Sequence, residues 1–372
     1  MSDNQNEPRE YDAVLGGQNS IPVNAAVLGG IPGVKSRLAS PIVEVRIVAL
    51  SEALKYGEAG LDLIMQALHD ESMQLKLAAY LLLKDRDDLK IKPPFQDYLP
   101  IFEFDVITVD AYGKENSRRK SSAHYLREDL GNGVVLEMVY IPGGTFMMGS
   151  PATALTRYHN ESPQHQVTVP TLYAGKYPIT QAQYEAVMGN NPSYFMGEKR
   201  PVESVSWHEA VAFCRKLSEK TGKIYRLLSE SEWEYACRAG TTTPFYFGET
   251  ITTNLVNYNG NYQLVSEWNR QQTMDVGSFP PNPFGLYDMH GLVVEWCSDK
   301  WHDDNYDGAP TDGSSWETGT DNYRVRRGGS CENDAIACRA AHRTYYSAGH
   351  SYRSWGFRVA VALAVPSSLS SL

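Results

Sequence analysis

The first hundred residues carry apolar side chains at helical spacing. We expect a helix that begins at Ser40-Pro41, as N-cap and first helical position, and that ends at Gly57. Two further segments, 58–68 and 72–84, repeat the helical pattern. Short paired helices of this kind predict a small all-α, HEAT-like domain over residues 1–98.

From residue 101 the period of the pattern changes to two. Residues 102–113 alternate as a strand and then turn, and residues 134–150 read as strand, turn and strand. Between them, residues 117–133 are polar and rich in turn-forming types, so we expect a loop there. A second domain, over residues 101–365, is therefore predicted.

Capping-box sequences predict the start of three helices in this second domain. The pairs have the spacing at which the side chain of each residue accepts a hydrogen bond from the backbone amide of the other. They are Thr180 with Gln183, Ser206 with Glu209 and Ser229 with Glu232. Residues 240–323 are dominated by Asn, Gly, Pro, Asp and aromatic types. This combination predicts an α+β domain with long irregular connections.

Composition narrows the classes of function. The chain has 372 residues, enough for two domains, and a net charge of −10, which argues against sequence-independent binding to nucleic acid. Neither a signal peptide nor an apolar run of membrane-spanning length is present, so we expect no membrane association and a cytoplasmic location. Five cysteines, an odd number, are expected to be buried thiols.

Eight ordered motifs between residues 140 and 360 carry a family resemblance. They are IPGGTFMMGS, ESPQHQVTV, YPITQAQYEAVMG, RPVESVSWHEAVAFC, YRLLSESEWEYACRAG, VGSFPPNPFGLYDMHGLVVEWCSD, RVRRGGS and GFRVA. Together they resemble the formylglycine-generating enzyme/sulfatase-modifying-factor family, which implies a C-type-lectin-like fold. The family includes oxidases, ergothioneine-type synthases and proteins without a catalytic role, so fold alone does not assign an activity.

The oxidase activity requires two cysteines to hold copper, because soft thiolates bind Cu(I). In the enzymes of the family these occupy the third and eighth positions after the GGS motif, which are Asn333 and Cys338 here. Cys331, at the first position, leaves a shifted pair open as an alternative. We therefore expect no copper and no enzymatic activity, with a copper-dependent formylglycine-generating oxidase as the alternative. The synthases of the family carry an additional iron-binding domain with His ligands. Because no suitable His cluster occurs in the N-terminal region, we do not expect a synthase.

Two pairs of side chains, Glu161 with His165 and Asp288 with His290, are spaced for a metal but lack a third ligand, so no catalytic metal is assigned. The resemblance does imply structural calcium. Its oxygen ligands in this chain would be Asp288, Glu295 and the carbonyl groups of Gly291 and Val293, with a second site at Asn254 and the Leu255 carbonyl whose other ligands fall in residues 266–273. The alternative is that the carboxylates accept hydrogen bonds from loop amides.

The segment from about 325 to 358 has a further resemblance. RGGS, CRAAHR and GFR resemble the fixed framework of variable proteins that diversity-generating retroelements diversify, many of which have this lectin-like fold. Randomised template adenines yield a restricted residue set, and between 331 and 355 only Glu332 and Trp355 belong to excluded types.

The composition of this segment also suits a binding surface, because Tyr and Trp offer rigid contact area and Ser, Asn and His adaptable hydrogen bonds. The predicted ligand-binding residues are Cys331, Asn333, Asp334, Ala335, Ile336, Ala337, His342, Thr344, Tyr345, Tyr346, His350, Ser351, Tyr352, Ser354 and Trp355. We expect two-thirds of them to be exposed, the alternative being tyrosines that pack a long loop. The guanidinium groups of Arg339, Arg343 and Arg358 are expected to fix the backbone beneath them.

These observations predict a non-enzymatic ligand-binding protein with a diversified surface. The ligand is an unknown protein, peptide or glycan. A sugar site that works through calcium is not expected, since no EPN- or QPD-like tripeptide is present. The helical domain is expected to dock to a protein partner, and an adaptor in which that domain carries the function is a third alternative.

Overall fold

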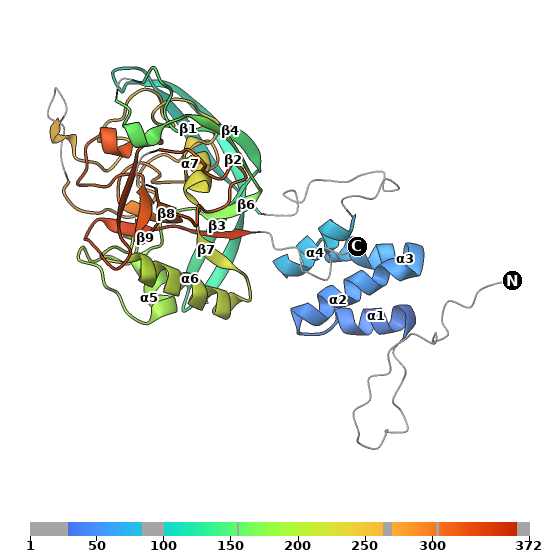
Figure 1. The fold of residues 1–372 in the computed structure, drawn as a ribbon. Helices are drawn as coiled ribbons and strands as arrows, with labels where there is room; N and C mark the ends of the chain where they lie inside the picture. The colour runs from blue at the N-terminus through green and yellow to red at the C-terminus, as the bar shows by residue number, and fades with distance from the viewer. Residues whose placement is uncertain (1–28, 84–99, 155, 263–269, 303–304, 363–372) are drawn as a thin grey trace. The chain divides into compact units, whose positions relative to one another are not determined.

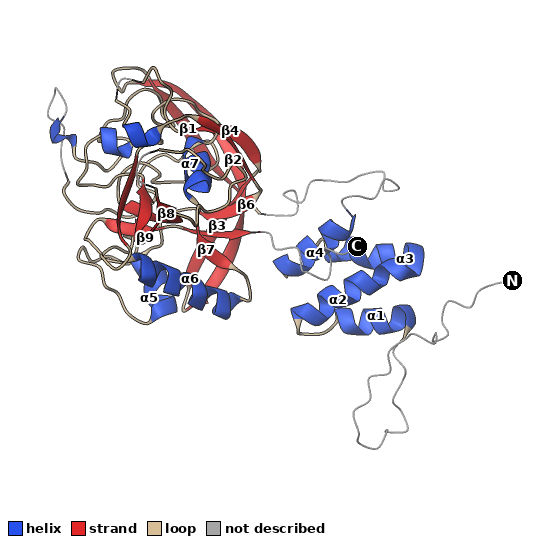
Figure 2. Cartoon of the chain, viewed as in Figure 1, coloured by secondary structure: helices blue, strands red, loops and turns tan. Residues whose placement is uncertain are grey.

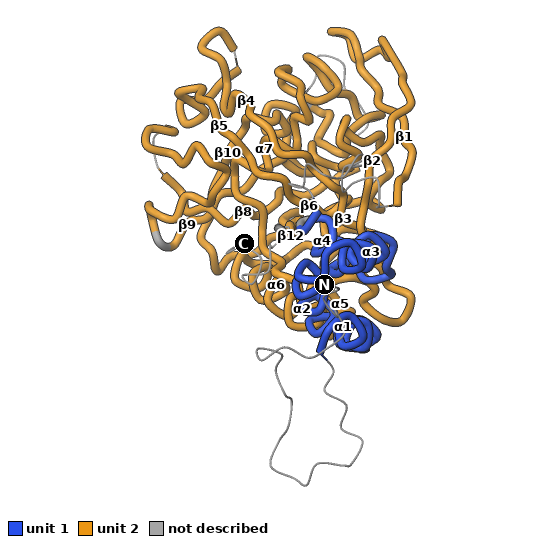
Figure 3. Tube along the Cα trace, turned by 90° about the vertical axis from the view of Figure 1, so that its right-hand side faces the viewer, with its two compact units in different colours: residues 1–99, 364–372 blue, residues 100–363 orange. Residues whose placement is uncertain are grey.

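The structure is a computed structural model, and it describes residues 29–83, 100–154, 156–262, 270–302 and 305–362. Two compact units make up the chain, one of residues 1–99 with 364–372 and one of residues 100–363 (Figures 1 and 3). Within the described ranges, no helix has the length and apolar character that crossing a bilayer requires.

The first unit is helical over residues 29–83, with α1 (Gly30–Leu38), α2 (Val43–Ala53), η1 (Leu54–Tyr56), α3 (Gly57–Ala67) and α4 (Met73–Leu83). The three predicted helical segments are confirmed, although the predicted part beyond residue 83 lies outside the described residues. The predicted start at Ser40-Pro41 is wrong. Ser40 Oγ accepts the Ile42 amide at 3.1 Å, which makes a turn and delays the helix to Val43.

A single apolar cluster holds these helices together. Val34 of α1, Leu50 of α2 and Ile64 of α3 are fully buried in it, and Leu75 of α4 is nearly so. Arg46 of α2 forms an ion pair with Asp70, which precedes α4. The helical unit therefore has a core of its own, as an independent domain requires.

The strands that the structure describes in the second unit form three sheets. The strands are β1 (Ile101–Val109), β2 (Glu115–Gly131), β3 (Val134–Ile141), β4 (Gly144–Met148), β5 (His165–Val169), β6 (Leu172–Gly175), β7 (Tyr225–Leu227), β8 (Val294–Trp301), β9 (Thr320–Arg327), β10 (Arg343–Ser347), β11 (Trp355–Phe357) and β12 (Val359–Ala362). The largest sheet has the order β1-β2-β3-β6-β12-β7, the second β10-β9-β8-β11, and the third pairs β4 with β5.

Strand β2 corrects the expectation of a loop over residues 117–133. It pairs antiparallel with β1 through Ser117–His124 and with β3 through Tyr125–Gly131. Its first half is mostly exposed, so polar side chains there cost little, and only later residues such as Leu126 and Leu130 are buried. Pairing with two partners, which the local sequence does not reveal, makes it a strand.

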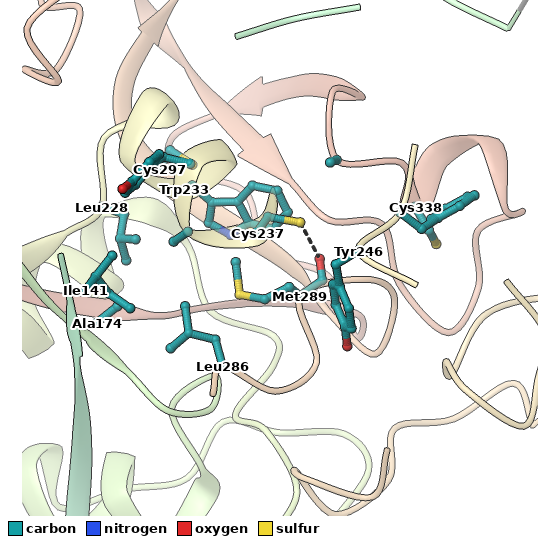
Figure 4. Close-up of a cluster of buried hydrophobic side chains, with 14 of the residues drawn as sticks. Ile141, Ala174, Leu228, Trp233, Cys237, Tyr246, Leu286, Met289, Cys297 and Cys338 are labelled. Atoms are coloured by element: carbon teal, nitrogen blue, oxygen red, sulfur yellow. Dashed lines mark hydrogen bonds between the residues drawn. The ribbon is translucent and has the colours of Figure 1, made fainter. Parts of the chain in front are cut away.

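The three predicted capping boxes are confirmed. They begin α5 (Gln181–Met188), α6 (Trp207–Thr221) and α7 (Glu230–Arg238). Helices α5 and α6 lie side by side at one edge of the unit (Figure 2). Helix α7 is buried along its length and sends Trp233 and Cys237 into the core, where the Cys237 thiol lies 3.8 Å from the Met289 carbonyl (Figure 4).

Candidate functional site

The predicted ligand-binding segment runs from the end of β9 through η5 (Ile336–Cys338) and β10 to β11. Six of its fifteen predicted residues are exposed: Ile336, Tyr345, Tyr346, His350, Ser351 and Tyr352. Seven are half-buried: Asn333, Asp334, Ala335, Ala337, His342, Thr344 and Trp355. The expectation that two-thirds are exposed is therefore too high, but thirteen of the fifteen reach solvent at least in part.

Cys331 and Ser354 are buried, which corrects their assignment to the surface. The Cys331 amide donates to the Leu292 carbonyl at 3.2 Å, and the carbonyl of Ser354 accepts the Val294 amide at 2.9 Å. Both residues therefore fasten the segment to the start of strand β8. Their place in the predicted set reflected the sequence between the framework motifs, which does not distinguish anchors from exposed positions.

An aromatic cluster forms the centre of the exposed part. The ring centroid of Trp355 lies 4.8 Å from that of Tyr346 and 5.7 Å from that of Tyr352, and His350 meets Tyr346 edge-on at 5.2 Å. The guanidinium carbon of Arg326 lies 3.8 Å from the centroid of Trp355. These contacts hold the rings in place while Tyr346 and Tyr352 remain exposed by 42% and 47%.

The cluster borders an open depression of about 440 Å³. It is lined by Arg326, Ser330, Glu332, Asn333, Tyr346, His350, Ser351, Tyr352, Ser354 and Trp355. Seven of these residues belong to the predicted set, whereas Arg326, Ser330 and Glu332 do not. Alternation along β9 would have found Arg326, because its neighbour Arg327 points into the core and successive strand residues face opposite sides.

Buried ion pairs support the segment from below, as predicted for the three framework arginines. Arg339 holds both carboxylate oxygens of Glu161, at 2.8 and 2.6 Å. Arg343 does the same with Glu230, at 2.8 and 2.6 Å.

Arg358 holds Glu295 at 3.2 and 2.9 Å and also donates to the carbonyl groups of Gly175 and Tyr287. The bidentate geometry of these pairs fixes the backbone on which the surface side chains stand.

The two cysteines of the alternative oxidase site are both buried thiols. Burial raises the pKa of Cys331 to about 12 and raises the pKa of Cys338 as well. Cys338 belongs to the main apolar cluster, together with Cys237 and Cys297 (Figure 4). Neither thiol has an environment that favours its thiolate, the form that binds copper.

Both carboxylates of the first predicted calcium site, Glu295 and Asp288, have protein partners. Arg358 takes both carboxylate oxygens of Glu295, and the indole of Trp233 donates to one of them at 2.8 Å. Asp288 accepts the Gly277 amide at 2.7 Å, and burial raises its pKa to about 6. Because a guanidinium already neutralises Glu295, the donor set does not fit calcium well.

The second predicted calcium site is described only in part. Asn254 is exposed, and the Leu255 amide donates to the Thr252 carbonyl at 2.9 Å. Residues 266–269, among which further ligands were expected, lie outside the described residues. Across the residues that the structure describes, no three His, Cys, Asp or Glu side chains come together as a metal site.

Comparison with known proteins finds relatives of the second unit. Residues 129–363 match the model of the sulfatase-modifying factor enzyme 1-like domain. The chaperone protein LppX of Paenibacillus barcinonensis is 29% identical over 268 residues, 60% of this chain and 88% of that protein.

Two solved structures are similar to the same part of the chain. PvdO from Pseudomonas aeruginosa aligns with a TM-score of 0.57 at 33% identity, and Treponema denticola variable protein 1 with a TM-score of 0.55 at 28% identity. Each similarity covers 64% of this chain and 98% of the other.

Proposed function

The chain belongs to the sulfatase-modifying factor enzyme 1-like family through residues 129–363, and from this premise we propose that its second unit is a ligand-binding module rather than an enzyme. The exposed and half-buried residues between positions 331 and 355 form the binding surface in this proposal. The ligand is a protein, a peptide or a glycan that contacts the aromatic cluster of Tyr346, Tyr352 and Trp355.

One observation carries the proposal: exposed aromatic rings stand on a backbone that buried ion pairs hold. Tyr345, Tyr346 and Tyr352 are 40–47% exposed, although each is packed against another ring on one side. Rigid, half-exposed tyrosines lose little conformational freedom when they bind, which is the property that antibody combining sites use. A loop that merely needed packing would bury these rings.

We further propose that this surface is diversified. The likeness to a variable protein at 28% identity supports this proposal, as do the framework motifs around residues 331–355. The test is to sequence the surrounding locus for a near-copy of the codons for residues 325–360. Differences confined to template adenines, with a reverse-transcriptase gene nearby, would support diversification, and absence of such a copy would refute it.

The alternative oxidase is tested separately. Oxygen consumption with copper and a cysteine-containing peptide is measured for the unaltered protein and for the Cys331→Ser and Cys338→Ser variants. The binding module predicts no copper-dependent uptake in any of the three proteins. Uptake that both substitutions abolish would identify the oxidase instead.

For the first unit we propose a docking role toward a protein partner. Helices α1 to α4 bury a common apolar core, and Ile42 and Val48 remain 55% and 52% exposed on the surface. The test is recovery of one partner at a fixed ratio by the full chain, with loss of that partner when both residues are changed to Ser. An unchanged ratio would refute the role.

A further inference from the structure

Arg326 is a buried cation that pairs with no carboxylate in the described part of the chain. The residue is only 6% exposed, and it lines the depression beside Tyr346 and Trp355. Nη2 donates to the Tyr345 carbonyl at 3.1 Å, but Nε and Nη1 find no hydrogen-bond partner among the residues that the structure describes. The other arginines beneath the segment, such as Arg343 and Arg358, hold a carboxylate with both arms of the fork.

The surroundings of Arg326 explain how the charge is tolerated. Three rings surround the guanidinium carbon, with centroids at 3.8 Å for Trp355, 5.3 Å for Tyr346 and 5.4 Å for Trp296. Cation–π contacts compensate part of the lost hydration, but they leave the edge donors unused. A desolvated cation with free donors is stabilised by any anion that reaches it.

The acidic group that lines the same depression is already engaged. Glu332 accepts from Arg353 Nε at 2.8 Å and from Ser354 Oγ at 3.0 Å. It therefore leaves Arg326 uncompensated, and its own charge disfavours a dianion such as phosphate more than it disfavours a single carboxylate. A singly charged anion, attached to a group that can pack against the aromatic rings, suits the depression best.

From these contacts we infer that Arg326 anchors an Asp or Glu side chain of a peptide ligand. This inference rests on the proposed function and gives its ligand a chemical class. The carboxylate enters the depression beside Trp355 and pairs with the guanidinium group of Arg326, which lines it. The neighbouring peptide chain lies on Tyr346 and Tyr352, whose exposed faces suit apolar or aromatic residues.

The test uses a phage-displayed library of random dodecapeptides, fused at their C-termini so that only side chains supply carboxylates. It is selected on the full chain and on its Arg326→Met variant. We expect Asp and Glu to be enriched at least twofold over the starting library on the unaltered protein and to return to library frequency on the variant. In a selected synthetic peptide, changing the critical Asp to Asn should weaken binding roughly tenfold or more.

Two controls keep the result interpretable. Arg215→Met changes the net charge equally at an exposed position of α6 and should retain the acidic preference. If Arg326→Met does not fold, as judged by its circular dichroism, Arg326→Gln keeps polar donors without the charge and should also lose the preference.

The outcomes separate the inference from the proposed function. Peptides that need Tyr352 but show equal acidic content on the unaltered protein and on the Arg326 variants would overturn the inference and leave the binding surface standing. Failure to enrich any peptide that depends on Tyr352 would overturn the peptide class of ligand as well. A preference that Arg215→Met also abolishes would reduce the effect to net charge and equally overturn it.

Discussion

Arg343 and Glu230 form a bidentate ion pair in the interior of the second unit, with Nε and Nη2 of the arginine 2.8 and 2.6 Å from the two carboxylate oxygens. Glu230 begins helix α7, and Arg343 begins strand β10. The pair thus joins residues 331–355 to α7, a helix that is buried along its length. Arg327 also contacts Glu230, at 3.1 Å, so the carboxylate lies between two guanidinium groups.

Changing Arg343 to Met should destabilise the protein by about 3–5 kcal/mol, because Glu230 then loses its bidentate partner while it stays buried. The measurement is the free energy of unfolding in urea. Arg353→Met is the matched control, since Arg353 pairs with Glu332 at an exposed position and its loss should cost at most about 1 kcal/mol. Equal losses for both variants would show that the interior pair is not a special support.

Substitutions in the exposed cluster should have little effect on stability. We expect Tyr346→Ser and Tyr352→Ser each to change the free energy of unfolding by about 0.5 kcal/mol, a typical value for surface positions. Tyr173→Ser, in which a fully buried ring is removed from β6, should cost about 3–5 kcal/mol. A large loss at Tyr346 or Tyr352 in the same urea experiment would mean that these rings pack the fold rather than bind a ligand.

The five cysteines should resist modification in the folded protein. All five are buried as free thiols, and burial raises the pKa of Cys214 to about 12. The thiolate is the reactive form, so iodoacetamide at pH 8 should label none of them natively and all five in denaturant. Mass spectrometry counts the labels. Rapid native labelling at Cys331 or Cys338 would contradict this and would favour the oxidase alternative.

His290 should make stability depend on pH. Nδ1 lies 2.7 Å from the Cys338 carbonyl and Nε2 accepts the Tyr246 amide at 3.1 Å, an arrangement that suits the neutral ring. Burial lowers the pKa of His290 from 6.5 to about 3. The contribution of His290 to the free energy of unfolding is fully present above pH 6.5. It is lost at about 1.4 kcal/mol per pH unit as the pH falls toward 3.

The His290 contribution is isolated by comparing urea unfolding of the unaltered protein with that of His290→Gln at pH 7, 5.5 and 4.5. The advantage of the unaltered protein should shrink as the pH falls. A difference that is constant over this range would mean that His290 titrates normally in the folded state.

Removal of calcium should have little effect on the thermal stability of the protein. Arg358 neutralises Glu295 in the structure, so we expect EDTA to shift the thermal midpoint by less than it does for Arg358→Met, in which Glu295 is freed to bind a cation. Differential scanning fluorimetry with and without EDTA makes the comparison. A large shift in the unaltered protein, together with calcium uptake by calorimetry, would instead support the calcium site implied by the family.

Local signals in the sequence were sufficient where structure is local. The boxes that begin α5, α6 and α7 involve residues three apart, so their spacing alone predicted them. Strand β2 was missed because its polar first half is stabilised by β1, a partner that hydrophobic patterning does not identify. The helix start near Ser40 was missed for a different reason, since a side chain that can cap can also close a turn.

In the candidate site, too, local features could be predicted from the sequence and contacts between distant residues could not. Composition and the framework motifs located the exposed tyrosines, and they also predicted the roles of Arg339, Arg343 and Arg358. Sequence did not identify which carboxylate each arginine would meet, because Glu161 and Glu230 lie 178 and 113 positions away from their partners. The environment of Arg326 depends equally on Trp296 and Trp355, which come from different strands.

Strand β12 follows residues 331–355 in the chain, yet it lies inside the largest sheet, between β6 and β7. That sheet is therefore complete only after residues 331–355 have been synthesised in the correct reading frame. A frameshift or stop codon within the segment removes an interior strand and exposes the edges of both neighbours. Copies of the gene with such a change would thus yield chains that fail to fold and are degraded.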